Sequence, residues 1–267
     1  MTRDEPALGP RHHEVKRLRA LLRDRGARRT EEAFVLEGPR LVADALRRGA
    51  PIETLYLGPG AKTAFAAPVA DARAAGIRVC ELKEGVLEKV GTTRTPQPVL
   101  AVSPIPRRVT DLRTGGVVMV LVGVADPGNL GTLLRSAEAA AVGLVLCCGE
   151  TVDAFNPKTV RSSAGAIFGV PVVEDADPVH ALGMLGAAGY RRIGTVATGG
   201  RRYTDADLGG AIAIVLGSEA HGLPEGVADR LDERVTIPMA GALESLNLAV
   251  AGSVLCFEAA RQRAATR

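Results

Sequence analysis

The chain has 267 residues, 46% hydrophobic and 24% charged, which supports one large or two modest domains and excludes wholesale disorder. No apolar run is long enough to cross a bilayer, and the charged N-terminus lacks the apolar segment of a signal peptide, so we expect a cytoplasmic protein and no membrane partner. The formal net charge is only +3, but the first fifty residues carry 12 Lys and Arg against 8 Asp and Glu.

The first segment of the chain is a predicted basic helix. Apolar residues recur there at the spacing of one helical face: Val15, Leu18, Leu21 and Leu22. Arg17, Arg28 and Arg29 are candidate contacts to RNA phosphates. A solvated basic helix in an arginine-rich chain is the alternative interpretation.

The rest of the first hundred residues alternates helix and strand patterns. We expect helices over 38–49 and 64–76, and strands over 52–57, 77–82 and 99–103. Two prolines and a glycine pair then predict a linker. The expected division is an N-terminal domain over 1–106, a linker over 107–116 and a C-terminal domain over 117–267.

The second half has short Val-, Ile- and Leu-rich runs separated by helical segments. The expected strands are 117–124, 143–148, 170–173, 192–197, 211–216 and 234–238. This pattern predicts an α/β fold with a mainly parallel sheet covered on both faces. Residues 243–263 predict a final helix, helical after its start. Its expected apolar stripe is Leu246, Val250, Val254 and Phe257.

A glycine-bearing turn, DPGNLG, follows the strand at 117–124 directly and opens a helix. From Gly123 it matches the spacing of a phosphate-binding P-loop, but Asn129-Leu130 replaces the required Lys-Ser/Thr. The dinucleotide fingerprint GxGxxG and the GxSxG nucleophile elbow are also absent. Asn129 as a helix cap and Arg135 as an ordinary surface residue remain the structural alternative.

Two later junctions have the same strand-loop-helix form. Gly217 and Glu219 follow the strand at 211–216, and Ser245-Leu246-Asn247 precede the last helix. Ligands of open α/β sheets bind beyond the carboxyl ends of strands, so the three junctions could line one crevice.

These three motifs in this order resemble the SpoU (TrmH) family of RNA ribose 2'-O-methyltransferases, within the SPOUT superfamily. The resemblance rests on Asn129 with Arg135, on GSEAHG at 217–222 and on IPM…SLN at 237–247; residues 156–172 are also similar. It is strong over 117–263, whereas 11–103 resemble the family's small substrate-binding domain.

The resemblance implies a small N-terminal α/β RNA-binding domain, a SPOUT catalytic domain with a trefoil knot, a homodimer and S-adenosylmethionine as cofactor. It implies that Gly217, Ile237 and Leu246 contact the cofactor. The implied catalytic residues are Arg135, Asn129, Glu219, Ser245 and Asn247. One departure is 245-SLNLA-249, where Ala249 replaces the frequent serine.

The implied activity is S-adenosylmethionine-dependent methylation of a ribose 2'-hydroxyl in RNA, with 23S rRNA favoured over tRNA. The family proposal makes Arg135 the base, but a guanidinium resists deprotonation, so we expect Arg135 mainly to bind a phosphate and to stabilise developing oxyanion charge. A catalytically silent RNA-binding protein and a small-molecule enzyme are the alternatives. Four cysteines without CxxC spacing and four unclustered histidines predict buried thiols and no metal.

Overall fold

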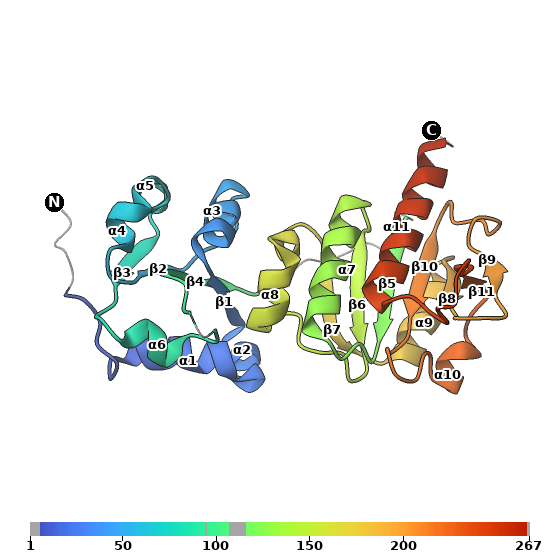
Figure 1. The fold of residues 1–267 in the computed structure, drawn as a ribbon, viewed down its shortest axis with the longest axis horizontal. Coiled ribbons are helices and arrows are strands. Elements are labelled where there is room, and N and C mark those ends of the chain that lie inside the picture. The colour runs from blue at the N-terminus through green and yellow to red at the C-terminus, as the bar shows by residue number, and fades with distance from the viewer. Residues whose placement is uncertain (1–5, 94, 107–115, 266–267) are drawn as a thin grey trace. The chain divides into compact units, whose positions relative to one another are not determined.

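The computed structural model describes residues 6–93, 95–106 and 116–265 (Figure 1). Of the expected linker, 107–115 lie outside the described residues. The chain divides into two compact units: unit 1 is Met1–Pro106 with Phe155–Phe168, and unit 2 is Arg107–Ala154 with Gly169–Arg267. Residues 155–168 thus group with unit 1 by their contacts, although we expected this segment in the C-terminal domain. The domain boundaries predicted from the sequence remain a prediction.

Unit 1 contains a four-stranded mixed sheet in the order β1-β4-β2-β3. The strands are β1 (Ala33–Glu37), β2 (Thr54–Leu57), β3 (Arg78–Glu81) and β4 (Val99–Pro104). β4 is antiparallel to β1 and β2, and β2 is parallel to β3. β1 was not predicted, because its five residues are all buried and do not alternate between apolar and polar.

Short helices accompany this sheet. They are α1 (His13–Arg23), α2 (Arg25–Glu31), α3 (Pro39–Arg47), α4 (Ala61–Ala64), α5 (Ala66–Ala74), α6 (Val86–Val90) and α8 (Pro157–Ser163), with the 3-10 turn η2 (Ala166–Phe168). The expected apolar face of α1 is confirmed, because its four residues are buried in the unit 1 core. The helix expected over 64–76 belongs to two helices, since α4 ends before Phe65 and α5 starts after it.

Unit 2 contains a seven-stranded parallel sheet in the order β7-β6-β5-β10-β8-β11-β9, which confirms the predicted fold class. The strands are β5 (Val117–Val122), β6 (Leu144–Cys148), β7 (Val172–Ala176), β8 (Arg191–Thr195), β9 (Arg201–Arg202), β10 (Ile212–Leu216) and β11 (Glu233–Thr236). The central strands β5, β6 and β10 are buried along their whole length. The two-residue edge strand β9 is too short to produce a periodic signal in the sequence.

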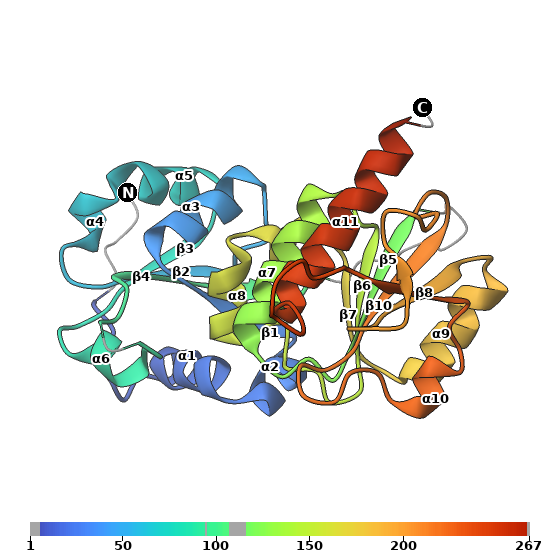
Figure 2. The same cartoon turned by 45° about the vertical axis from the view of Figure 1, so that its right-hand side comes forward.

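The helices of unit 2 are α7 (Pro127–Ala139), α9 (Pro178–Ala187), α10 (Glu225–Ala228) and α11 (Leu248–Ala265). α7 and α11 pack side by side (Figure 2). At Gly252 the helices approach so closely that a Cβ atom would lie 2.4 Å from Leu133 Cδ2. Ser136 and Ser253 join the two helices through a 2.6 Å hydroxyl hydrogen bond.

The apolar stripe expected on α11 is not its buried face. Val250 and Phe257 are 47% and 52% exposed, and small residues occupy most of the buried face instead. The buried residues of α11 are Ala249, Gly252, Leu255, Cys256 and Ala259. Within the described ranges, no helix combines the length and the apolar character needed to span a bilayer.

Candidate active site

The candidate site lies at the carboxyl end of the parallel sheet of unit 2. β5 and β10 are neighbours in register, with Leu121 opposite Leu216, so the turns that follow them start side by side. The chain continues from β5 to β6 on one side, whereas β8 and β11 lie on the other side of β10. This reversal of strand order is where open α/β sheets form ligand crevices.

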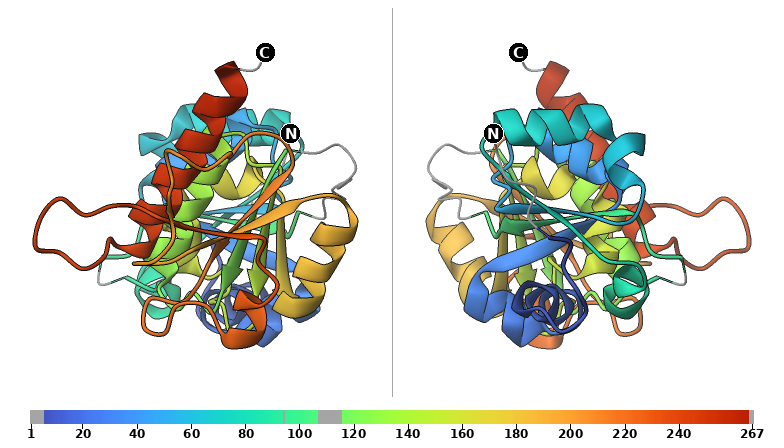
Figure 3. Two further views of the ribbon diagram at one scale, coloured as in Figure 1. Left: turned by 90° about the vertical axis from the view of Figure 1, so that its right-hand side faces the viewer. Right: turned by 90° about the vertical axis from the view of Figure 1, so that its left-hand side faces the viewer.

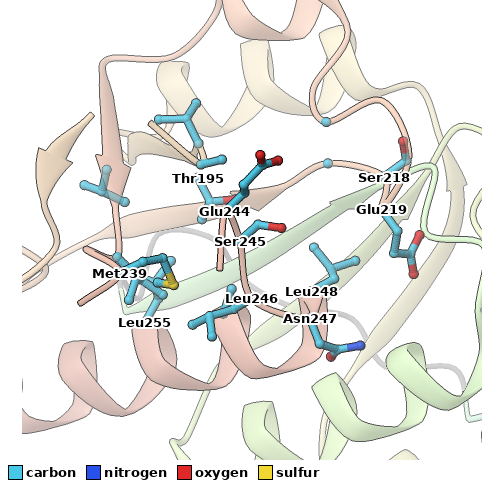
Figure 4. A pocket seen from close by; sticks show the side chains of 17 residues that line it. Thr195, Ser218, Glu219, Met239, Glu244, Ser245, Leu246, Asn247, Leu248 and Leu255 are labelled. Atoms are coloured by element: carbon cyan, nitrogen blue, oxygen red, sulfur yellow. The ribbon is translucent and has the colours of Figure 1, made fainter. Parts of the chain in front are cut away.

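A cavity of about 490 Å³ opens at this end of the sheet (Figure 4). Its walls come from the end of β8, the 217–222 turn, the end of β11 and the start of α11. Gly217, Ile237 and Leu246 all line it, as do Glu219, Ser245 and Asn247. The expected cofactor residues therefore share one cavity, and their contact with a cofactor stays a prediction. Sequence reasoning missed Thr195, Met239 and Glu244, which also line it; Thr195 was detectable as the last residue of a strand.

Gly217 permits an unusually close approach of two backbone segments. A Cβ atom at this position would lie 2.2 Å from the carbonyl carbon of Gly222 and 2.5 Å from the nitrogen of Leu223. Ser218 and Gly222 close the turn with two backbone hydrogen bonds of 3.0 Å. Any side chain at 217 would push this wall of the cavity apart.

A chain of side-chain hydrogen bonds connects the three junctions. Asn247 donates through Nδ2 to Oδ1 of Asn129 at 3.0 Å, and Asn129 donates through Nδ2 to Oε1 of Glu219 at 2.8 Å. The backbone nitrogen of Ala125 also donates to Glu219, at 3.3 Å. The network fixes the amide orientation of Asn129, whose backbone nitrogen in turn donates to Asp126.

The Glu219 carboxylate is held in its charged form. Partial burial acts to raise its pKa, but donors outweigh this effect: the Asn129 side chain and the backbone N–H groups of Glu219, Ala125 and Asp126. The pKa of Glu219 is therefore lowered from the ordinary glutamate value. A hydrogen-bonded anion thus lies at the edge of the cavity, beside the first turn of α7.

Asn247 also begins the last helix. Its Oδ1 accepts from the backbone nitrogens of Ala249 at 2.9 Å and Val250 at 3.3 Å. Ala249, the departure from the family pattern, is 2% exposed and is not among the cavity-lining residues. The lost serine hydroxyl would therefore not have faced the cavity.

Arg135 lies on α7, two turns after Asn129, with an exposed side chain. It does not line the cavity, and in the described part of the chain it forms no hydrogen bond or ion pair. Its five N–H donors are thus available to an external anion. Ser245 is exposed at the cavity.

The three candidate phosphate-binding arginines of unit 1 differ in exposure and in their partners. Arg28 corrects the expectation: its side chain is 4% exposed and donates to the carbonyl oxygen of Leu21 at 2.6 Å, so it cannot reach a phosphate. Arg17 is paired with two carboxylates, at 2.5 and 2.9 Å. Arg29 is exposed.

The cysteines are buried, as predicted. Burial raises the pKa of Cys256 to about 12, and burial with the nearby charge of Asp177 raises that of Cys148 to about 12, so neither is an activated nucleophile. Among residues 6–93, 95–106 and 116–265, no cluster of three or more His, Cys, Asp or Glu side chains could hold a metal ion.

Comparison with known proteins adds to this geometry. Residues 116–257 match the SpoU rRNA Methylase family, and residues 12–101 match the MRM3-like substrate binding domain. The 23S rRNA (guanosine(2553)-2'-O)-methyltransferase RlmP of Bacillus subtilis is 32% identical over 84% of this chain and 87% of its own. The AdoMet-bound rRNA methyltransferase of Sinorhizobium meliloti superposes with a TM-score of 0.79 at 32% identity, covering 94% of this chain and 95% of that one. The SpoU methyltransferase AviRb of Streptomyces viridochromogenes, in complex with AdoMet, gives 0.80 at 28% identity, covering 96% and 100%.

Proposed function

Since the chain belongs to the SpoU rRNA Methylase family, we propose that it methylates a ribose 2'-hydroxyl of 23S rRNA with S-adenosylmethionine as methyl donor. The observation that carries the proposal is the hydrogen-bonded series Asn247–Asn129–Glu219 beside the cavity. The relative from Bacillus subtilis, named for this reaction on 23S rRNA, supports the choice of substrate.

The cavity fits S-adenosylmethionine in size and chemistry. Ligand sites of about 300–1,000 Å³ with mainly apolar walls and a few polar groups are usual for such molecules. Ile237 and Leu246 supply apolar walls for a planar base, and Gly217 keeps the turn free of a side chain. When bound, the cofactor supplies an activated methyl group on its sulfonium.

The polar side chains of the site position and activate the substrate. Asn129 and Glu219 tie the first turn of α7 to the 217–222 turn, which fixes the helix that carries Arg135. We assign Arg135 to the phosphate next to the target ribose, because a guanidinium binds phosphate with two parallel hydrogen bonds. In that position it also stabilises negative charge that develops on the 2'-oxygen as its proton leaves.

Arg135→Lys tests this assignment, because lysine keeps the charge but loses the planar pair of donors. We expect methyl transfer to fall at least about tenfold. Arg73→Lys, at an exposed arginine of α5, is the control and should retain full activity. Near-normal turnover of Arg135→Lys would contradict both the anchoring role and a role as base.

We assign the enzyme a homodimeric state and the trefoil knot of its family. Exposed apolar side chains of unit 2 support the dimer: Val250 and Phe257 lie on one stripe of α11, and Leu243 is 72% exposed. Leu243 belongs to the loop between β11 and α11, which projects away from the rest of unit 2 (Figure 3). Covering these side chains with a second copy of the chain removes apolar surface from water and so stabilises the dimer.

Phe257→Glu should convert the dimer to a monomer, measured by size-exclusion chromatography with light scattering. Met184→Glu is a matched control, because Met184 is also 52% exposed but lies on α9. A Phe257→Glu variant that keeps the mass of the wild type would exclude this face of α11 as the interface.

The decisive experiment for the function is transfer of radiolabelled methyl to fractionated rRNA and tRNA, followed by mapping of the 2'-O-methyl site. We expect label in 23S rRNA. Label only in tRNA would redirect the substrate assignment. No label in either pool, with cofactor binding intact, would favour a silent RNA-binding protein on the same scaffold.

A further inference from the structure

We propose that unit 1 carries a separate phosphate-binding subsite for the RNA, in the hollow formed by residues 6–12 and Lys83. The inference rests on the proposed function in taking RNA as the substrate. The hollow measures about 470 Å³. It is lined by Pro6, Ala7, Leu8, Gly9, Pro10, Arg11, His12 and Lys83.

Backbone pairing fixes the walls of this hollow. Leu8 donates to the carbonyl oxygen of Glu81 at 2.7 Å, and Lys83 donates to the carbonyl oxygen of Leu8 at 3.0 Å. Leu8 itself is buried in the unit 1 core beside Leu82. The segment before α1 thus extends the edge of the sheet beyond β3, and the side chains of Arg11 and Lys83 come to one hollow from distant points of the sequence.

Among the described residues that line this hollow, the formally charged side chains are cationic. No carboxylate of the described residues lines it. Arg11 and Lys83 are exposed, and their side chains form no hydrogen bond or ion pair within the part of the chain that the structure describes. Among the described carboxylates close by in the sequence, Glu84 does not line the hollow, Glu81 pairs with Lys62 at 2.7 Å, and Glu14 is engaged by Tyr56 and Arg78.

His12 contributes a hydrogen-bond donor to this hollow. Its Nδ1 accepts from the backbone nitrogen of Glu14 at 3.3 Å, as the N-cap of α1. In a neutral imidazole whose Nδ1 accepts, the proton resides on Nε2, so Nε2 is left as a donor. A guanidinium, an ammonium and an imidazole N–H around one hollow suit the oxygens of a phosphate.

Most of the hollow lies outside the segment that matches the substrate-binding domain. The match to that domain begins at residue 12, so six of the eight lining residues lie before it. The hollow does not include the basic residues proposed from the sequence. Of those residues, Arg17 is held by Glu31 and Glu53, and Arg28 is buried.

The test is the salt dependence of RNA binding by the full-length protein. The probe is a 23S rRNA fragment that the wild type methylates. Each lost phosphate contact lowers the slope of log affinity against log salt concentration by about 0.7–0.9. In the double variant Arg11→Ala/Lys83→Ala, we expect the magnitude of this slope to be smaller by about 1.5. We expect RNA affinity near physiological salt to be about tenfold or more weaker.

Arg47→Ala/Arg48→Ala removes two exposed cations that both pair with Asp44, so it is the matched control and should change the slope by less. Cofactor affinity should stay at the wild-type value in both double variants. Unchanged RNA affinity and slope in Arg11→Ala/Lys83→Ala, with the wild type still methylating the fragment, would overturn the subsite and leave the proposed function standing. A wild type that neither binds nor methylates any RNA would overturn both.

Discussion

Gly217→Ala is expected to weaken cofactor binding without unfolding the protein. The added Cβ would lie 2.2 Å from the carbonyl carbon of Gly222, where ordinary contact starts at 3.4 Å. The two backbone segments must therefore separate by about 1.2 Å, at an overpacking cost of about 1–3 kcal/mol. Separation also weakens the two Ser218–Gly222 hydrogen bonds, each contributing about 1 kcal/mol.

Because this turn lines the cavity, we expect S-adenosylmethionine to bind at least about tenfold more weakly, which corresponds to about 1.4 kcal/mol. Isothermal titration calorimetry measures the affinity, and thermal unfolding follows the fold. Gly226→Ala, on the nearby α10, is the control, since the nearest atom to its added Cβ is 3.9 Å away. Wild-type affinity and wild-type thermal stability in Gly217→Ala would refute the reasoning.

Three further predictions follow from the hydrogen bonds and packing of unit 2. Asn129→Ala should lower methyl transfer about tenfold or more, measured by label incorporation, while cofactor affinity by calorimetry changes little, because Asn129 contacts Glu219 but does not line the cavity. Because the pKa of Glu219 is lowered, its carboxylate stabilises the fold at pH values above the unfolded pKa of 4.5, and this contribution is lost as the pH falls through the folded pKa. The free energy of unfolding, measured with urea at decreasing pH, should therefore fall less in Asn129→Ala than in the wild type. Gly252→Ala should cost about 1–2 kcal/mol in urea unfolding, because its Cβ meets the side-chain ends of Leu133 and Leu216 and not backbone; an unchanged midpoint would contradict the close packing.

The last helix shows where periodicity misleads. The sequence pattern places large apolar residues on one stripe of α11, but α11 packs closely against α7 and buries mainly small residues, such as Gly252. Hydrophobicity alone predicts that Phe257 is buried and gives no such prediction for Gly252, although Gly252 is buried and Phe257 is exposed. The large residues therefore remain outside, on the face that we assign to the dimer.

The site shows what a pattern can locate. Asn129, Glu219 and Asn247 were placed in one crevice because each follows a strand of one parallel sheet, and the structure brings them into hydrogen-bond contact. Which of these side chains donates and which accepts depends on rotamers and loop geometry, and the spacing of residues in the sequence does not determine either. Arg28 was misjudged for a related reason, because a guanidinium can satisfy its donors on a backbone carbonyl inside the protein.

The segment 155–168 has a consequence for dissection of the molecule. The chain passes between the two units at three points along its length, so one proteolytic cut within 107–115 would detach residues 1–106 but leave residues 155–168 of unit 1 covalently attached to unit 2. A fragment ending at residue 106 would also lack Arg161, whose guanidinium meets the carboxylate of Glu37, a side chain with 1% exposure. Without Arg161, the buried Glu37 carboxylate would keep only the hydrogen bonds of Thr92 and would lose its cationic partner, which destabilises the unit. Unit 1 as a soluble fragment thus requires residues from the middle of the chain, and the gene cannot be divided into two independently folding halves at the linker.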